Sequence, residues 1–218
     1  VGTFSTYYSH HLCTLEGGLT VTNDEELDSV MQSIRSHGWI RHRSDKIEIA
    51  KKTGKDDPNF VFDYSGYNLR MSEPQAAMGI EQFKKLDAFI AQRQKNAEKF
   101  LSIANQILIE DIQTPIVSKN AKSSWFGMPV IIKKCNKHRL KGIKETLRKQ
   151  GIESRPFLAG NFATQPVMKK YNHIKYGSMV NTEMLEDCSL ALPCHQSLNA
   201  QDMERIAESL KQALETNK

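Results

Sequence analysis

Cysteine is scarce in this sequence of 218 residues, and the four that occur are far apart in the chain. Without any Cys-x-x-Cys pair, they do not fit the usual zinc or iron–sulfur spacings, which excludes the common metal centres of these types. The positions are Cys13, Cys135, Cys188 and Cys194. Long apolar runs are also missing, since no stretch approaches the ~18 residues of a membrane span, and no signal peptide is visible. The sequence therefore predicts a cytoplasmic protein with free thiols and no bound metal.

Charge of one sign is not in large excess either. The net charge is +5, and basic residues alternate with acidic ones, which is typical of a solvated surface rather than a nucleic-acid interface. A hydrophobic content of 39% and a charged content of 25% are ordinary for a globular protein. The length suffices for one large or two small domains with a real core. We expect a protein that binds neither nucleic acid nor membrane.

The most informative stretch runs from residue 5 to residue 18 and reads Ser-Thr-Tyr-Tyr-Ser-His-His-Leu-Cys-Thr-Leu-Glu-Gly-Gly. A β-rich run leads into two histidines, a Glu-Gly-Gly turn follows, and a second strand is expected over residues 19–22. Hydroxyls, imidazoles and flexible glycines between two strands suit a site where a polar ligand meets the backbone. Imidazole, with an unperturbed pKa of about 6.5, can act as a base or an acid near neutral pH.

Helical periodicity organises the next 80 residues. Acidic capping residues at 23–26 and apolar residues at helical spacing predict a helix that ends at His37 and Gly38. Residues 39–65 are polar and are expected to be irregular, and residues 66–70 are expected to form a turn. A capping box at residues 72–75 opens one long helix, or two helices broken near Asp87.

The second half of the sequence has the pattern of an α/β unit. A strand is expected over residues 125–132, at a sheet edge because it contains a proline. A basic amphipathic helix over 137–150 is followed by a short strand at 152–156 and a loop at 159–162. Further helices are expected at about 181–188 and 200–216, on either side of a turn around residues 192–195.

The stretch around His10 resembles the active-site segment of the DegT/DnrJ/EryC1/StrS family of sugar aminotransferases, which are fold-type I enzymes dependent on pyridoxal phosphate. The usual family pattern is a serine, then Asn-Lys or Thr-Lys, then Glu-Gly-Gly, and the lysine binds the cofactor covalently. Here His10 takes the lysine position and Ser9 the asparagine position, as in the small branch of GDP-4-keto-6-deoxymannose 3-dehydratases. The loop Ala159–Phe162 resembles the same branch. The iron–sulfur relatives carry cluster cysteines in a region where this chain has none.

The resemblance also implies roles for individual residues. His10 would be the catalytic base and acid, Ser5 would bind the cofactor phosphate, and Ser9 would lie beside the cofactor. Asn68, within a Gly-Tyr-Asn-x-Arg segment that ends at Arg70, would reach the cofactor phosphate in the partner subunit's site. From the residues alone, that segment could equally be a turn.

Other site residues are less certain from sequence. In the dehydratase branch the histidine at His37 lies near the active site, although the sequence alone favours a helix-end cation that satisfies carbonyl groups. Arg155 could pair with a carboxylate or phosphate, with a surface salt bridge as the alternative. Glu153 and His195 are further candidates for the substrate side, with their roles left open. His11, which would point to the opposite face of a strand, is expected to be structural.

The implied reaction is removal of the C3 hydroxyl from a GDP-4-keto-6-deoxy sugar in deoxysugar and O-antigen (lipopolysaccharide) biosynthesis. Pyridoxal 5'-phosphate and its pyridoxamine form would be bound non-covalently, glutamate would supply the amino group and become 2-oxoglutarate, and ammonia would be released. Family members are homodimers with shared active sites. Two alternatives remain open: a nucleotide-sugar 4-keto aminotransferase, and a catalytically silent fragment or assembly module.

The implied fold is α/β and fold-type I aminotransferase-like. Family members run to nearly twice this length, so we expect the C-terminal part of a longer enzyme. Residues 1–100 would form the C-terminal part of the large cofactor-binding domain, including a long bridging helix. Residues 101–218 would form the small C-terminal α/β domain.

Overall fold

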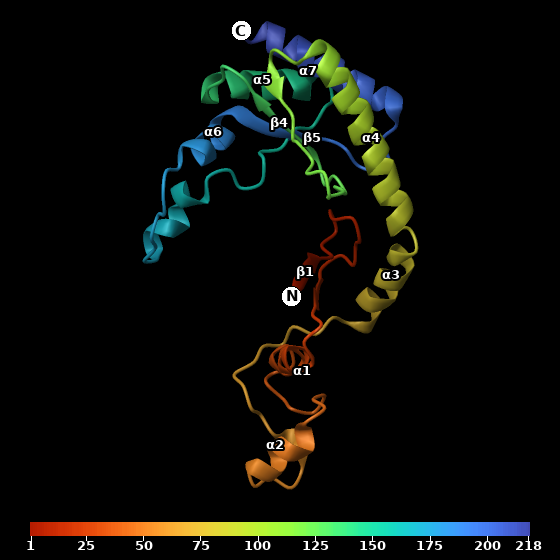
Figure 1. Cartoon of the computed structure of the whole chain (residues 1–218), viewed down its shortest axis with the longest axis vertical. Helices are drawn as coiled ribbons and strands as arrows, with labels where there is room; N and C mark the ends of the chain where they lie inside the picture. Colours follow the sequence, from red (N-terminus) through yellow and green to blue (C-terminus); the bar gives the residue numbers. More distant parts are fainter. The chain divides into compact units, whose positions relative to one another are not determined.

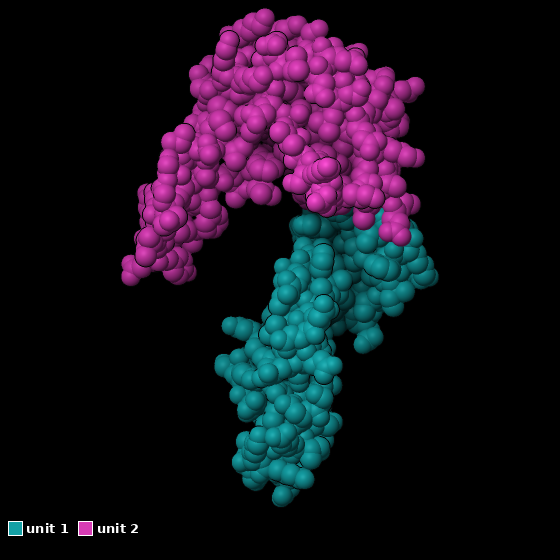
Figure 2. Space-filling view, viewed as in Figure 1, with its two compact units in different colours: residues 1–86 teal, residues 87–218 magenta.

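The computed structural model describes all 218 residues, and the chain divides into two compact units, Val1–Leu86 and Asp87–Lys218 (Figure 2). The domain boundary expected near residue 100 stays a prediction. No helix of the chain has both the length and the apolar character needed to cross a bilayer. The elements follow one another as β1 (Gly2–Ser5), β2 (Gly18–Val21), α1 (Glu25–Ile34), α2 (Lys46–Lys52), α3 (Glu73–Phe83), α4 (Leu86–Ile107), β3 (Ile112–Gln113), β4 (Met128–Ile132), α5 (Lys137–Lys149), α6 (Val180–Cys188), β5 (Ser189–Leu192) and α7 (Ala200–Thr216) (Figure 1).

The first unit begins with an antiparallel hairpin of β1 and β2, which confirms the two expected strands. Gly2 pairs with Val21 and Ser5 pairs with Gly18, so residues 6–17 form the loop between the strands. Apolar side chains of both strands are exposed, among them Phe4 and Leu19.

Helix α1 confirms the prediction of a capped helix after residue 23. The side chain of Asp24 accepts a hydrogen bond from the Leu27 amide at 2.9 Å, and acidic residues fill the first turn, where they suit the helix dipole. The helix ends at Ile34, and His37 and Gly38 then adopt positive φ angles of 65° and 84°. This turn redirects the chain away from the helix axis.

Helix α2 corrects the expectation that residues 39–65 are irregular. It packs Ala50 against Ile40 and Val61, which form a small buried cluster. Just before α2, the Arg43 guanidinium makes a bidentate ion pair with the Asp45 carboxylate, with nitrogen–oxygen distances of 2.8 and 2.7 Å. The helix has only seven residues and one fully buried position, so it is too short to show a recognisable apolar period.

The long helical pattern after residue 72 forms two helices, α3 and α4, as one of the two expected alternatives. The break falls between Phe83 and Leu86. The predicted capping box is present, with the Gln75 Oε1 atom accepting from the Ser72 amide at 3.0 Å.

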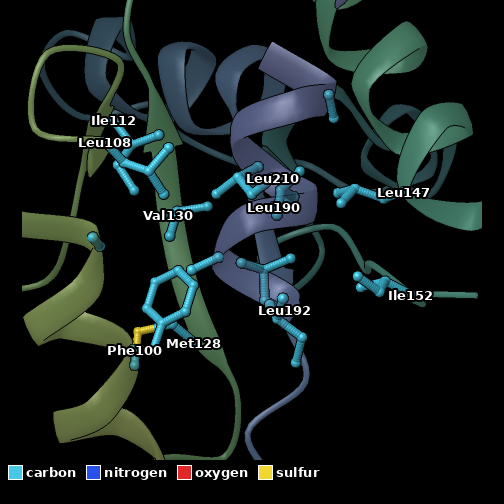
Figure 3. Close-up of a cluster of buried hydrophobic side chains, with 14 of the residues drawn as sticks. Phe100, Leu108, Ile112, Met128, Val130, Leu147, Ile152, Leu190, Leu192 and Leu210 are labelled. Atoms are coloured by element: carbon cyan, nitrogen blue, oxygen red, sulfur yellow. The ribbon is translucent and has the colours of Figure 1, made fainter. Parts of the chain in front are cut away.

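The second unit has a three-stranded antiparallel sheet in the order β3-β4-β5. Helices α4, α5 and α7 contribute side chains to its core, where residues such as Phe100 and Leu147 meet strand residues such as Val130 and Leu190 (Figure 3). The buried members of this cluster include Ala97 and Phe100 of α4, Leu140, Ile143 and Leu147 of α5, and Met203, Ile206 and Leu210 of α7. The second unit therefore contains the main core of the chain.

Two expectations for the sheet were wrong. Strand β4 is central rather than at an edge, although its Pro129 pairs only with Ala191 of β5, because β3 is too short to extend beyond Ile131. A proline is tolerated there because one side of the strand is locally unpaired. Residues 152–156 form no strand, and only Arg155 makes a bridge, to Ala191.

Candidate active site

The loop between β1 and β2 is closed by a buried pair of threonines. The side-chain oxygens of Thr6 and Thr14 lie 2.6 Å apart, and both residues are almost fully buried. The Thr14 amide donates to the Thr6 carbonyl at 2.8 Å, and the Thr6 amide donates to the Gly17 carbonyl at 3.0 Å. These bonds bring the two ends of the loop together, so the histidines between them lie on a closed turn rather than on a free segment.

Helix α3 supports this loop from one side. The Gln75 side chain donates to the Glu16 carbonyl at 2.8 Å. At Gly79 a Cβ atom would lie only 3.1 Å from the Thr14 methyl group, so the absence of a side chain lets the loop approach the helix closely. A Cβ at Gly17 would collide with the hydroxyls of both threonines, and its φ of 150° also favours glycine. The Glu-Gly-Gly turn is therefore required by the way the loop closes.

His10 is half-buried within the closed loop, as is the preceding Ser9. Its backbone amide donates to the Tyr7 carbonyl at 2.9 Å, and its ring lies 6.0 Å from the Tyr7 ring, centre to centre. The hydroxyl of Ser5 accepts from the Tyr7 amide at 3.3 Å and is exposed at the end of β1. The first lysine of the sequence is Lys46, so no lysine of this loop can attach a cofactor covalently.

A second group of predicted residues meets at the end of α1. The Arg70 guanidinium lies 3.5 Å from the Nε2 atom of His37 and donates to the Asn68 side-chain oxygen, also at 3.5 Å. The His37 ring packs edge-on against Trp39 at 5.2 Å. The structure thus brings His37 together with Asn68 and Arg70, which come from a different segment of the first unit. The side chains of Asn68 and Arg70 are exposed.

The approach of these two segments depends on glycine. The His37 amide donates to the Tyr67 carbonyl at 2.7 Å, and a Cβ at Gly66 would lie 2.1 Å from the Gly38 nitrogen. The interpretation of His37 as a cation that satisfies helix carbonyls is not supported, because the amides of Arg35 and Gly38 reach those carbonyls instead. The imidazole is left to contact Arg70.

In the second unit, Glu153 and Arg155 form an exposed ion pair with a nitrogen–oxygen distance of 3.0 Å, and more than half of each side chain is accessible. This is the arrangement expected of the surface alternative, and such pairs contribute little to stability. The Arg155 backbone is fixed by its bridge to Ala191, with hydrogen bonds of 3.0 and 2.8 Å. The side chain itself remains accessible to an anion.

His195 lies near a buried cation that the sequence interpretation missed. The His195 carbonyl accepts from the Asn96 side chain at 2.9 Å. Burial lowers the pKa of the His195 imidazole, and the nearby Arg93 charge lowers it further. Arg93 is only 4% exposed, and burial lowers its own pKa. The signal in the sequence was an arginine on the apolar face of a helix, four residues before Ala97.

Arg93 organises the turn around Trp125 and Phe126. Its Nη1 atom donates to the Trp125 and Phe126 carbonyls at 2.9 and 3.1 Å, and its Nε atom donates to Gln196 at 3.0 Å. Trp125 has a positive φ of 51°, which is uncommon for a residue with a side chain. The buried guanidinium therefore holds a strained turn in place.

The residues of the hairpin loop can do acid–base chemistry beside an anion. Imidazole is the side chain that most often serves as a general acid and base. The Ser5 hydroxyl, which uses only its oxygen toward Tyr7, keeps its hydrogen to donate to a phosphate. Together these groups suit a phosphorylated ligand that is held without a covalent bond.

Comparison with known proteins shows what the chain as a whole is similar to. GDP-4-keto-6-deoxy-D-mannose 3-dehydratase of Escherichia coli O55:H7 is 38% identical over 97% of this chain and 54% of its own length. A solved GDP-4-keto-6-deoxymannose-3-dehydratase (ColD) variant with bound GDP-perosamine superposes with a TM-score of 0.82 at 37% identity, over 96% of this chain and 54% of that one. The same kind of enzyme with a trapped PLP-glutamate geminal diamine gives 0.80 at 35% identity over the same shares.

These similarities confirm the expected fold-type I aminotransferase-like fold. The chain spans about half the length of the curated relatives it matches. The profile of the DegT/DnrJ/EryC1/StrS aminotransferase family matches residues 1–211. Since this match covers nearly the whole chain and the fold is aminotransferase-like, the chain belongs to the DegT/DnrJ/EryC1/StrS aminotransferase family.

Proposed function

We propose that this chain acts within a pyridoxal phosphate-dependent nucleotide-sugar 3-dehydratase of deoxysugar biosynthesis. The substrate would be a GDP-4-keto-6-deoxy sugar, with glutamate as the amino donor. The observation that carries the proposal is His10 on a closed loop in a stretch without lysine. The similarity to a named 3-dehydratase supports it, as do related structures that hold GDP-perosamine or a PLP-glutamate adduct.

The net reaction balances for this set of partners. The sugar loses one oxygen atom from C3, glutamate becomes 2-oxoglutarate by gaining one oxygen atom, and its nitrogen leaves as ammonia. When bound, pyridoxal phosphate supplies the electron sink for such chemistry and carries the amino group. Ser5 would donate its hydroxyl hydrogen to the cofactor phosphate. Because the loop has no lysine, the cofactor would be held by non-covalent contacts.

His10 would serve as the proton carrier. The hydrogen bond from its backbone amide to the Tyr7 carbonyl and its place between the two threonines fix the backbone that carries the imidazole. A ring nitrogen would accept a proton and then deliver one to the departing C3 hydroxyl, which leaves as water. Without a lysine amine nearby, completing an amino transfer to the sugar is disfavoured.

Other residues would bind substrate or the second subunit. We propose that Asn68 binds cofactor phosphate in the shared site of a homodimer, with Arg70 and His37 positioned beside it by their mutual contact. Arg155 would pair with an anionic group of the substrate, in exchange for its exposed contact with Glu153. His195 would act indirectly, through the turn that Arg93 holds. The exposed apolar side chains of the hairpin support burial of this face against the rest of a longer enzyme.

We propose the cytoplasm as the location. The four cysteines are all free thiols, as is usual for proteins kept in a reducing compartment.

The test is to incubate the full-length protein with pyridoxal phosphate, glutamate and a GDP-4-keto-6-deoxy sugar, and to measure ammonia release and product mass together. We expect ammonia and a product that lacks the C3 oxygen. A 4-amino sugar without ammonia would instead indicate an aminotransferase, and a protein that shows no cofactor absorbance would indicate a silent module.

Two neighbouring histidines provide a matched pair of variants. His10→Asn should abolish deoxygenation, whereas His11→Gln should leave it largely intact, and circular dichroism should show the same fold for both. Borohydride treatment should fail to fix the cofactor to the wild-type chain, because no lysine of the loop holds it. Retained activity in His10→Asn would place the base elsewhere.

A further inference from the structure

Two cysteines that are 53 positions apart in sequence meet in the second unit. Cys135 lies in the turn between β4 and α5, and Cys188 is the last residue of α6. Ile131 of β4 pairs with Ser189 of β5, so Cys188 directly precedes β5 beside the end of β4. The Cys135 thiol donates to the Asn136 carbonyl at 3.4 Å, and Cys188 lies close enough to help raise the pKa of the Cys135 thiol.

A second interaction holds the same two elements together. The Lys137 ammonium at the start of α5 lies 3.3 Å from the Asp187 carboxylate, next to the end of α6. Cys135 is half-buried, whereas Cys188 is 9% exposed. A small reagent can therefore reach the pair from the side of Cys135, while the pairing of Ile131 with Ser189 keeps the two backbone segments together.

We propose that Cys135 and Cys188 form a reversible redox modification site, in which a disulfide of the glutathione class oxidises the two thiols to one intramolecular disulfide. The Cys135 thiolate attacks one sulfur of glutathione disulfide and releases one glutathione. The Cys188 thiolate then attacks Cys135 in the mixed disulfide and displaces the second glutathione. Two electrons pass to the oxidant, and the two thiol protons end on the two released glutathiones.

The other two cysteines are unsuited to this reaction. Cys194 is 1% exposed, and its thiol donates to the Arg93 carbonyl at 3.6 Å. Cys13 belongs to the hairpin loop of the first unit, where its sulfur accepts from the Leu15 amide at 3.4 Å. Only the pair in the second unit has a sulfur partner.

The local charges determine how fast the pair reacts. Burial raises the pKa of the Cys135 thiol to about 11, and Cys188 contributes in the same direction, while the Asn136 backbone and the Arg139 charge on α5 oppose the shift. The thiolate is the reactive form, so the reaction is slow at neutral pH and accelerates about tenfold for each unit by which the pH rises toward the pKa. The pair therefore remains reduced under mild conditions and responds to sustained oxidation.

The experiment treats the purified, folded chain with glutathione disulfide at neutral and at mildly alkaline pH, and maps disulfides by mass spectrometry of non-reduced peptides. We expect one cross-link, between the peptides that contain Cys135 and Cys188, formed faster at alkaline pH and reversed by dithiothreitol. The melting temperature of the second unit should rise by several degrees, because the cross-link restricts the unfolded chain.

Cysteine variants separate this site from non-specific oxidation. Cys194→Ser should retain the cross-link, whereas Cys188→Ser should lose it and leave Cys135 as a mixed disulfide with glutathione. A sample unfolded in urea gives the reference for random pairing among four cysteines. The proposal is overturned if the folded chain yields no link between Cys135 and Cys188, or yields it no more often than the unfolded reference. Cys188→Ala repeats the test should the serine variant melt before oxidation begins.

Discussion

Replacing Arg93 with methionine should destabilise the second unit more than any change of an exposed arginine. The guanidinium is buried and donates three hydrogen bonds, two of them to the carbonyls of Trp125 and Phe126. Methionine has a similar volume and would fill much of the space, so the loss would come mainly from the missing donors. The strained backbone at Trp125 would also lose the contact that holds it.

The magnitude follows from the acceptors that are left behind. Each buried acceptor without a donor costs about 1–3 kcal/mol, and Arg93→Met abandons three acceptors, on Trp125, Phe126 and Gln196, whose bonds are partly buried and therefore count near the lower limit. Part of this cost is offset, because the burial that lowers the pKa of Arg93 shows that the charge itself is poorly solvated. We expect a net loss of about 3 kcal/mol in the free energy of unfolding.

Tryptophan fluorescence provides a local assay. The sequence has two tryptophans, so Trp39→Phe leaves Trp125 as the single reporter beside Arg93. Urea unfolding should show a lower midpoint with an unchanged slope, as expected when stability falls without a change in the surface exposed. Arg155→Met is the matched control, because Arg155 is exposed in a surface ion pair that is worth at most ~1 kcal/mol. If Arg93→Met costs no more than this control, the role assigned to the buried guanidinium is wrong.

Two further predictions concern other parts of the chain. Gly66→Ala should destabilise the first unit by about 3 kcal/mol because the new Cβ would meet Gly38 backbone, whereas Gly54→Ala, with open space at φ 66°, should cost only ~1 kcal/mol in urea unfolding followed at Trp39. The lowered pKa of His195 means that the unfolded chain binds its proton at higher pH, so the second unit should lose stability as pH falls below about 6.5. His195→Gln should flatten that part of the stability curve, and an unchanged curve would contradict the assignment.

Helices with strong local signals could be predicted from the sequence. Helix α7 begins at the capping residue Asn199 and buries six positions on one face, so both its start and its inner face follow from local chemistry. Helix α5 likewise starts after the Asn136 cap and buries Leu140, Ile143 and Leu147. In such segments the propensity, capping and packing requirements agree.

Segments that depend on distant partners could not be predicted in the same way. Strand β3 has two residues and exists only because β4 lies beside it. Pro129 led us to expect β4 at a sheet edge, but β4 is the central strand. A proline requires only that its own side of the strand is unpaired, and the sequence does not show how far the neighbouring strand extends. Helix α2 was missed because a seven-residue helix with one buried position shows no helical repeat of apolar residues.

In the candidate site, too, residues within a local sequence pattern could be predicted, whereas residues joined only by the fold could not. The family resemblance identified His10 and Ser5 because a contiguous pattern contains them both. The bond between Thr6 and Thr14 that closes their loop, and the contact of His37 with Arg70, join residues that no local pattern relates. Arg93 was hidden because its partners lie about 30 and 100 positions further along the chain.

The buried cluster of the second unit determines where this protein can be shortened. Every member of that cluster lies between Ala97 and Leu214, so a recombinant chain of residues 87–218 would retain all of them and is suited to isotope labelling and spectroscopy. A chain cut at residue 101 would discard Phe100, which is 1% exposed, and loss of a buried phenylalanine side chain costs about 3–5 kcal/mol. The place to divide the gene therefore lies at the start of α4.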